Sequence, residues 1–130
     1  IVYTSKLTRL QYSLALYEPE NEELMTNRTL NRLFSHNLKE CGIIEICEPR
    51  DTNAGLSLGL VSKKIPAIHP YFKIVKNEDI KYGTKAFCEE TISEHAVEEA
   101  LKVSIALAKT GCDIIQKESL LTEVKNEFYK

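Results

Sequence analysis

The sequence lacks the features that mark several large functional classes. It has no apolar run near the roughly 20 residues that span a bilayer, and its first residues do not follow the basic, apolar and small-residue order of a signal peptide. Its 17 basic and 19 acidic residues leave a net charge of -2, which gives no broad field for binding nucleic acid or an anionic membrane. A cytoplasmic location is therefore expected, with neither nucleic acid nor membrane as a partner.

Short motifs that carry chemistry are also absent. There is no Gly-x-Gly-x-x-Gly, phosphate loop, nucleophile elbow or His-x-x-x-His pattern. The cysteines form no Cys-x-x-Cys pair and have no closely spaced histidine that would complete a zinc knuckle. Reduced, structural thiols are therefore expected for all of them: Cys41, Cys47, Cys88 and Cys112.

The length and hydrophobic content of the chain are enough for one domain, or for part of a domain. The chain has 130 residues, of which 43% are hydrophobic, and this is ordinary for a soluble globular protein. It opens on Ile1 without an initiator methionine, in a segment that resembles the middle of a fold. A fragment of a larger protein is therefore expected.

The first third of the chain predicts a strand followed by a helix. Residues 2–16 are rich in Thr, Tyr, Leu and Val with partial alternation, which favours one long strand. After a polar turn, Thr26 or Asn27 can cap a helix, and Gly42 supplies its left-handed end. Apolar residues fall at helical spacing between these signals: Leu30, Leu33, Phe34, Leu38 and Cys41.

The middle of the chain predicts short strands and a loop. The apolar residues 43–46 follow the glycine directly, as a buried strand does in an α/β unit. Residues 48–59 contain proline, glycine, aspartate and asparagine and predict a loop of the kind that often carries function. Two further short strands are expected over residues 65–69 and 71–75, separated by a kink at Pro70.

The last third predicts two helices. The run from Thr91 to Glu94 has the form of a capping box, and a nearly unbroken three-four repeat follows it. That apolar face is expected to be buried, most simply against a sheet, and a final amphipathic helix is expected from about Glu118 to Phe128. The residues on the expected buried face are Val97, Ala100, Leu101, Ser104, Ile105, Ala108, Cys112 and Ile115.

His69 is the strongest candidate for a functional residue. At a strand end, its side chain could point into a cleft and donate a hydrogen bond to a carboxylate or an oxyanion. The alternative is a partly buried histidine bonded to a neighbouring carbonyl. The remaining histidines, His36 and His95, and the paired glutamates at 89–90 and 98–99 are interpreted as surface charge.

Several stretches together resemble one enzyme family. They are Gly59-Leu60-Val61-Ser62, then Ile65-Pro66-Ala67-Ile68-His69-Pro70-Tyr71-Phe72, and Gly83-Thr84-Lys85-Ala86-Phe87 followed by a helix. This order resembles the C-terminal part of the zinc-dependent aminoacylase and carboxypeptidase family. The closest branch resembles the amidohydrolases that act on aminobenzoyl-glutamate and on dipeptides with a basic residue.

The resemblance implies an α/β fold, as a fragment of a sheet flanked by helices. Residues 1–16 would be the last strand of a dimerisation (lid) domain, and residues 17–130 the C-terminal part of the catalytic domain. The family uses two zinc ions to hydrolyse an N-acyl or peptide amide, and most of its ligands precede this region. The implied partners are the remainder of the catalytic domain, a second copy in a homodimer, and a small carboxylate-bearing amide substrate. The implied substrate-binding residues are Ala67, Ile68 and His69.

Two positions depart from the family pattern. Gly83 stands where the family has a histidine ligand, and Ser57 stands where it has an aspartate. No catalytic or metal-binding residue is therefore assigned to this chain, and no zinc is expected on it alone. One alternative is a non-catalytic homologue that acts as a binding or regulatory subunit. Another is a self-standing α/β module, which would require the strand over residues 2–16 to find a partner, as in a strand-mediated dimer.

Overall fold

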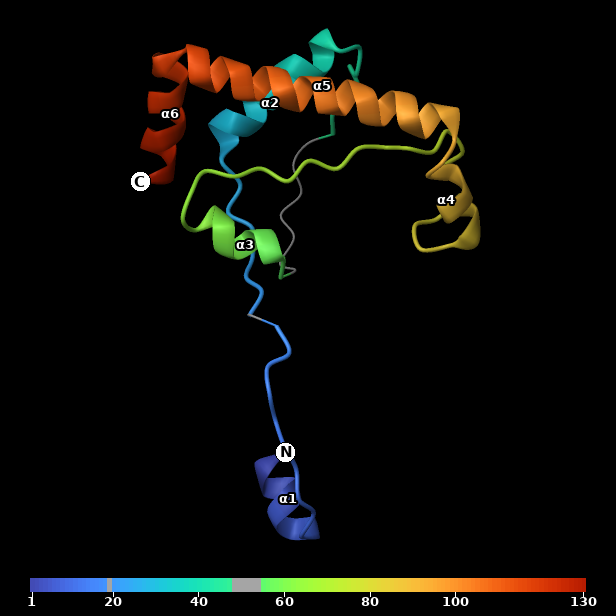
Figure 1. Cartoon of the computed structure of the whole chain (residues 1–130), viewed down its shortest axis with the longest axis vertical. Helices are drawn as coiled ribbons and strands as arrows, with labels where there is room; N and C mark the ends of the chain where they lie inside the picture. Colours follow the sequence, from blue (N-terminus) through green and yellow to red (C-terminus); the bar gives the residue numbers. More distant parts are fainter. Residues whose placement is uncertain (19, 48–54) are drawn as a thin grey trace.

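The computed structural model describes residues 1–18, 20–47 and 55–130, and its regular elements are helices. Figure 1 shows α5 as the longest element, α6 turning sharply away from its end, and α1 far from the other helices at the end of a drawn-out segment. The helices are α1 (Val2–Thr8), α2 (Arg28–Glu40), α3 (Ser57–Ser62), α4 (Lys85–Glu90), α5 (Glu94–Gln116) and α6 (Glu118–Phe128).

Helix α2 begins and ends at the residues that the sequence predicts. The backbone N–H of Leu30 donates to Asn27 Oδ1 at 2.8 Å, so Asn27, rather than Thr26, is the cap. Gly42 follows the last turn with a φ of 89°, in the left-handed region that glycine adopts without strain. Helix α6 likewise spans the predicted Glu118–Phe128. Capping signals therefore locate α2 correctly, and the amphipathic pattern locates α6, whose start has no side-chain cap.

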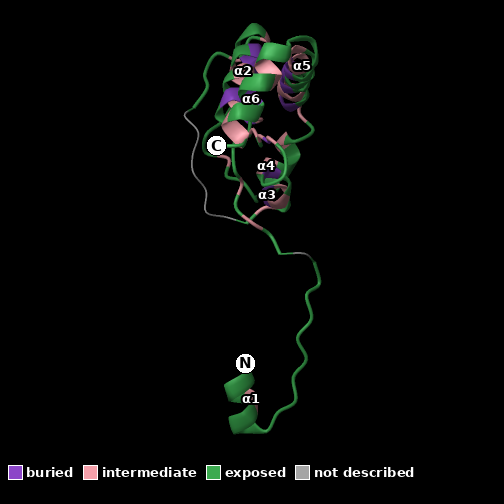
Figure 2. Cartoon of the chain, turned by 90° about the vertical axis from the view of Figure 1, so that its left-hand side faces the viewer, coloured by how far each residue is buried: buried purple, intermediate pink, exposed green. Residues whose placement is uncertain are grey.

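The core lies where α2, α5 and α6 pack together. Its buried side chains are Phe34 and Leu38 from α2 and Val103 and Ala106 from α5. Val124, 3% exposed, is the buried residue of α6. Figure 2 shows buried residues concentrated where α2 and α5 face each other. This cluster stabilises the helical part of the chain by removing apolar surface from water.

The α5 face that the sequence predicts to be buried is exposed within this chain. Val97, Leu101 and Ile115 are 61%, 60% and 85% exposed, and the buried residues of α5 lie on the opposite side. Those residues are Ala96, Val103, Ala106 and Thr110, whose small side chains allow α2 to approach closely. Helix α5 therefore has two apolar faces. We call the exposed one the outer stripe: Val97, Leu101, Ile105, Cys112 and Ile115.

The start of α5 lies two residues later than the capping box predicts. The N-cap is Ser93, whose Oγ accepts from the backbone N–H of Ala96 at 3.1 Å. Thr91 instead donates its hydroxyl to the carbonyl of Cys88 at 2.7 Å, at the end of α4. Thr91 is therefore used to end one helix and Ser93 to begin the next.

The strands that the sequence predicts do not form among the described residues. The segment expected as one strand over residues 2–16 is helical over Val2–Thr8 and then has no regular structure. Residues 43–46, 65–69 and 71–75 are also outside regular strands. Two isolated bridges occur among the described residues, Glu22 with Leu56 and Thr26 with Ala67. A strand is stabilised by a row of backbone hydrogen bonds to a neighbour, and in the described part of the chain these segments have at most a single bridge, that of Ala67 with Thr26.

Helix α3 occupies the end of the stretch that predicts a loop. Residues 48–54 of that expected loop lie outside the described residues, and Ser57–Ser62 are helical. The backbone N–H of Met25 donates to Ser62 Oγ at 2.9 Å, and this hydroxyl donates to the carbonyl of Gly59 at 2.7 Å. The Met25 bond and the bond from the N–H of Leu56 to the carbonyl of Glu22, at 2.8 Å, hold α3 against residues 22–25.

The four cysteines are free in the structure: Cys41 is half-buried, whereas Cys47, Cys88 and Cys112 are exposed. Within the described ranges, none of the helices combines the length and the hydropathy needed to cross a membrane.

Candidate functional site

The segment that contains the three predicted substrate-binding residues is anchored at its start. The backbone N–H of Asn27 donates to the carbonyl of Ala67 at 3.0 Å, and Ala67 is 9% exposed. Ile68 packs against the core cluster formed by α2 and α5. Ala67 and Ile68 therefore fix the backbone from which His69 projects, and a substrate-binding role for either residue stays a prediction.

His69 lies on the exposed side of this segment, next to an aromatic ring. The ring centroids of His69 and Tyr71 are 4.9 Å apart, with an interplanar angle of 59°. Tyr71 is 83% exposed, and His69 is exposed as well. The imidazole is therefore accessible to a ligand, and it can donate a hydrogen bond to an anionic oxygen. Its role in a substrate pocket stays a prediction.

The two departures from the family pattern lie on exposed backbone. Ser57 is the first residue of α3, and Gly83 precedes Thr84, whose Oγ1 accepts from the N–H of Phe87 at 3.2 Å to cap α4. In the described part of the chain, no hydrogen bond joins Ser57 or Gly83 to His69. These three positions are therefore not linked into one site by direct contact.

The described residues do not suit a zinc ion. No group of three or more His, Cys, Asp or Glu side chains with the geometry of a metal site occurs in the described ranges. Gly83 contributes no donor atom, and its φ of 82° is a conformation that residues with a side chain rarely adopt. The backbone at this position is thus adapted to glycine, although an added Cβ would meet nothing within 4 Å.

We expect Gly83→His to leave zinc binding unchanged, because one imidazole without two further ligands does not form a site. The same change should lower the free energy of unfolding by about 1 kcal/mol, because a side chain is forced into the left-handed region. Isothermal titration with zinc and urea denaturation would measure the two effects. Tight zinc binding by the single variant would contradict the geometry described above.

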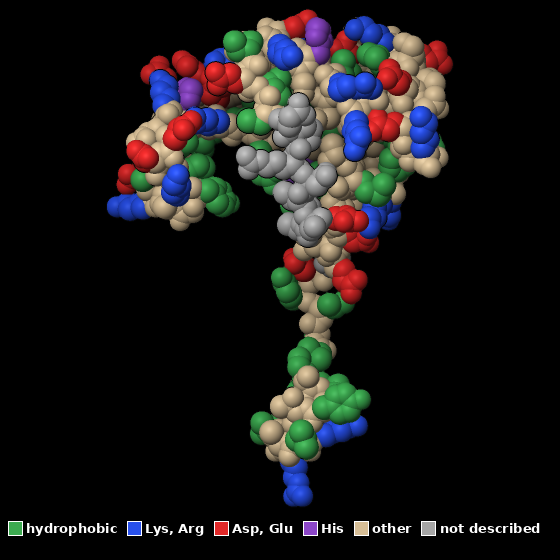
Figure 3. Space-filling view, turned by 180° about the vertical axis from the view of Figure 1, so that it is seen from behind, with side chains coloured by type: hydrophobic (Ala, Val, Ile, Leu, Met, Phe, Trp, Pro, Cys, Tyr) green, Lys and Arg blue, Asp and Glu red, His purple; other side chains and the backbone are tan. Residues whose placement is uncertain are grey.

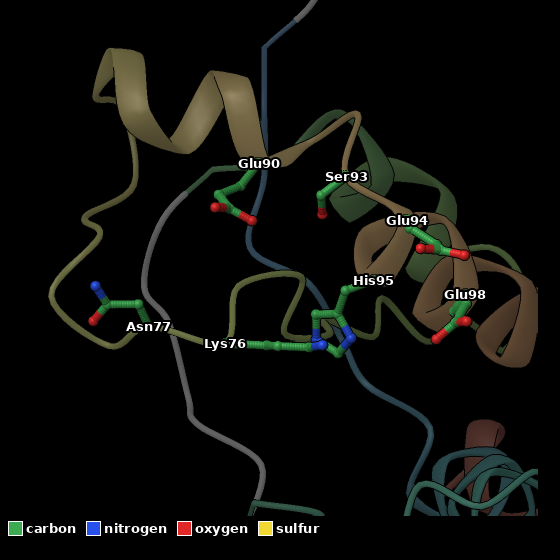
Figure 4. Close-up of a pocket in the computed structure, with 7 residues that line it drawn as sticks. All are labelled: Lys76, Asn77, Glu90, Ser93, Glu94, His95 and Glu98. Carbon is green, nitrogen blue, oxygen red and sulfur yellow. The ribbon is translucent and has the colours of Figure 1, made fainter.

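A polar hollow of about 400 Å³ lies at the start of α5 (Figure 4). It is lined by Glu90 at the end of α4, by Ser93, Glu94, His95 and Glu98 at the start of α5, and by Lys76 and Asn77 from the preceding segment. From the sequence, Glu90, Glu98 and His95 are interpreted as surface charge. The hollow is open to solvent, so we assign no chemistry to it.

Glu127 on α6 holds the N-terminus of α2. Its two carboxylate oxygens accept from the backbone N–H groups of Arg28 and Thr29 at 2.7 and 2.8 Å. In return, Asn27 Nδ2 donates to the carbonyl of Val124 at 3.0 Å. Burial acts to raise the pKa of Glu127, but the hydrogen bonds from Thr29 and Arg28 outweigh it, and the pKa is lowered. The sequence gives no local signal for this contact, because its partners are almost 100 residues apart.

Replacing Glu127 by Gln should lower the free energy of unfolding by about 1 kcal/mol near neutral pH, the typical effect of losing a charged helix cap. A lowered pKa means that this stabilisation is present above the pKa of the unfolded carboxyl and is lost as the pH falls through the folded value. The difference between wild type and variant should therefore vanish in acid. Urea denaturation across this pH range would measure it.

The matched control is Glu123→Gln on the same helix. Glu123 makes an exposed ion pair with Arg32 at 3.2 Å, and such pairs contribute little to stability. Equal effects of the two substitutions would contradict a capping role for Glu127.

Comparison with known proteins gives two significant relatives. The chain is 34% identical over 108 residues to the Xaa-Arg dipeptidase of Mus musculus, a match that covers 81% of the chain and 25% of that protein. It is 32% identical over 108 residues to the Xaa-Arg dipeptidase of Homo sapiens, covering 81% and 24%. No protein-family model matches the sequence. No solved structure matches it either.

The chain thus spans about a quarter of the length of the curated relatives that it matches. The similarity covers most of the chain and supports a relationship to dipeptidase-like hydrolases.

Proposed function

We propose that this chain is the C-terminal part of a metal-dependent amidohydrolase or peptidase that hydrolyses an N-acyl amino acid or a peptide amide bond. The observation that carries the proposal is the similarity to two Xaa-Arg dipeptidases over 81% of the chain. Their name gives the first substrate class to test, dipeptides with a C-terminal arginine. Such substrates carry the free carboxylate that an exposed histidine can bind.

The outer stripe of α5 supports a larger catalytic domain. An exposed apolar row of this length is unusual on a complete domain, where such faces are covered by another layer. We propose that the remainder of the catalytic domain supplies this layer as a β-sheet. The segments over residues 43–46, 65–69 and 71–75 would join that sheet as strands. Under this proposal residues 1–16 are the last strand of a dimerisation domain, and residues 17–130 belong to the catalytic domain.

The chain alone is not proposed to be active. The family's reaction uses a zinc-activated water, and the described residues do not gather a set of zinc ligands. We propose that most ligands of any zinc come from the remainder of the protein. The proposed contribution of this chain is His69, which would donate a hydrogen bond to the substrate carboxylate from a backbone fixed by Ala67 and Ile68.

A second candidate is a non-catalytic homologue that acts as a binding or regulatory subunit. Gly83 and Ser57 favour it, because neither can replace the histidine or the carboxylate of the family pattern. The two candidates share the fold and the His69 segment. They differ in whether the whole protein hydrolyses its ligand.

The test is to express the longest reading frame that contains this chain, and to assay hydrolysis of an Xaa-Arg dipeptide with and without a chelator. The first candidate predicts hydrolysis that is lost on chelation and recovered with zinc, and no activity from the 130 residues alone. Binding of the dipeptide without hydrolysis would favour the subunit. A protein that neither binds nor hydrolyses the dipeptide would contradict both candidates.

His69→Ala tests the proposed binding role in the same protein. Loss of one hydrogen bond to a carboxylate should raise KM about tenfold or more, with a smaller change in kcat. His95→Ala is the matched control, since His95 lies in the separate hollow at the start of α5. Unchanged KM in His69→Ala would contradict the role.

A further inference from the structure

Tyr71 presents an aromatic face to solvent beside the candidate histidine. It is 83% exposed and lies on the extended connection that runs from α3 to α4 (Figure 1). Its ring contacts that of His69, with the centroids 4.9 Å apart and an interplanar angle of 59°. Because the two rings are tilted and not stacked face to face, a ligand can contact the imidazole and the face of the tyrosine ring together.

His69 and Tyr71 remain neighbours if this segment becomes a strand of a larger sheet. Successive side chains of an extended chain point to opposite sides, so residues 69 and 71 share one face. The start of the segment is fixed by the bond from the N–H of Asn27 to the carbonyl of Ala67, at 3.0 Å. The pair of rings is therefore compatible with the sheet that we propose for the complete catalytic domain.

An aromatic face attracts a cation, and the guanidinium of arginine suits it best. A cation within about 6 Å of the ring centroid is attracted by the negative face, and the planar guanidinium can also stack on the ring. Acidic charge contributes less near Tyr71. Lys73 pairs with Glu78 at 2.9 Å, so these two charges offset each other. Figure 3 shows acidic and basic side chains interspersed over the face that it presents.

One arginine residue can reach both rings. Its guanidinium carbon lies five bonds from Cα, about 6 Å away in an extended side chain, and its carboxylate is bonded to the same Cα. A carboxylate about 3 Å from the imidazole nitrogen therefore leaves the guanidinium within reach of a ring whose centroid is 4.9 Å away. We propose that Tyr71 determines specificity for a C-terminal arginine, by stacking on the guanidinium while His69 binds the carboxylate. The inference rests on the proposed function.

Two dipeptides that differ in charge but hardly in shape, Xaa-Arg and Xaa-citrulline, test this role in the product of the longest reading frame that contains the chain. Tyr71→Leu should lower the ratio of kcat/KM for arginine over citrulline about fivefold, the effect of one cation–π contact. Tyr71→Phe should keep the ratio within about twofold, because it retains the aromatic face. Equal losses in both variants would assign the effect to the hydroxyl and overturn the proposal.

Tyr82→Leu is the matched control. Tyr82 is 89% exposed, and its ring contacts that of Phe87 with the centroids 5.3 Å apart, so its loss should leave the ratio unchanged. If the whole protein binds the dipeptides without hydrolysis, the ratio of the two Kd values replaces that of kcat/KM.

The failure of this inference differs from the failure of the proposed function. A protein that acts on or binds the arginine dipeptide, with a ratio that Tyr71→Leu does not change or that Tyr82→Leu lowers equally, would overturn the role of Tyr71 alone. A protein that neither hydrolyses nor binds either dipeptide would contradict the proposed function as well.

Discussion

Replacing Asn37 by Asp is expected to lower the free energy of unfolding by about 3 kcal/mol at neutral pH, close to the effect of an uncompensated buried charge. Asn37 is 1% exposed, and its Nδ2 donates to Thr110 Oγ1 at 3.0 Å and to Asp113 Oδ2 at 3.1 Å. The Thr110 hydroxyl already donates to the carbonyl of Ala106 at 2.8 Å, so it has no second hydrogen to offer a carboxylate. The new charge would face Asp113 directly.

The pH dependence of this effect has a defined sign. Burial and the neighbouring carboxylate would raise the pKa of the introduced group above its unfolded value. The destabilisation should therefore be largest at neutral pH and shrink as the pH falls and the carboxyl gains a proton. Urea denaturation of both proteins over this range would measure it.

Asn31→Asp is the control on the same helix. Asn31 lies nearer the N-terminus of α2, where a negative charge is favourable, so its change should stay within about 0.5 kcal/mol. An Asn37→Asp variant as stable as wild type at neutral pH would contradict the hydrogen bonds that join Asn37 on α2 to Thr110 and Asp113 on α5.

Gly59→Ala is expected to detach α3 from residues 22–25. A Cβ at position 59 would lie 2.0 Å from the carbonyl oxygen of Glu22 and 2.5 Å from its carbon, both of them backbone atoms that cannot move independently. Relief of this overlap would break the bond from Leu56 N to the carbonyl of Glu22 (2.8 Å) and the bond from Met25 N to Ser62 Oγ (2.9 Å). The expected loss is about 3 kcal/mol of local stability, the upper part of the usual range for overpacking.

Amide hydrogen exchange gives the most direct readout, because α3 can open without global unfolding. The amides of Leu56 and Met25 should lose protection in Gly59→Ala. The control Gly111→Ala makes the same change in the interior of α5, where a Cβ meets nothing within 4 Å. It should raise stability by about 1 kcal/mol through helix propensity. Unchanged protection at Leu56 and Met25 in Gly59→Ala would contradict the close contact.

The features predicted correctly from the sequence depend on local signals. Asn27 and Gly42 delimit α2 because a cap and a left-handed glycine act over a few residues. The buried face of α5 could not be chosen this way, because the helix is apolar on two sides. The three-four repeat through Val97 and Leu101 suggested one face, yet α2 packs on the face of Ala96 and Ala106. An apolar repeat alone does not reveal which face a neighbouring element covers.

The features that the sequence did not predict depend on distant partners. The strand expected over residues 2–16 requires a neighbour that the described residues do not provide, so residues 2–8 adopt a helix instead. Glu127 resembles an ordinary surface glutamate until α6 reaches the start of α2. The surroundings of the candidate site could not be predicted from local sequence either. The sequence singled out His69, but its neighbour Tyr71 and the anchoring of Ala67 became evident only in the structure.

We propose that this chain is one part of a dipeptidase-like hydrolase, and that the remainder of the catalytic domain covers the outer stripe on α5. The most direct test is to assay the product of the longest reading frame containing the chain for zinc-dependent hydrolysis of an Xaa-Arg dipeptide. Amide exchange over α5 would be compared between this product and the 130-residue chain. We expect hydrolysis by the longer protein alone, with slower exchange along α5. A longer protein that neither binds nor hydrolyses the dipeptide, with exchange along α5 unchanged, would contradict it.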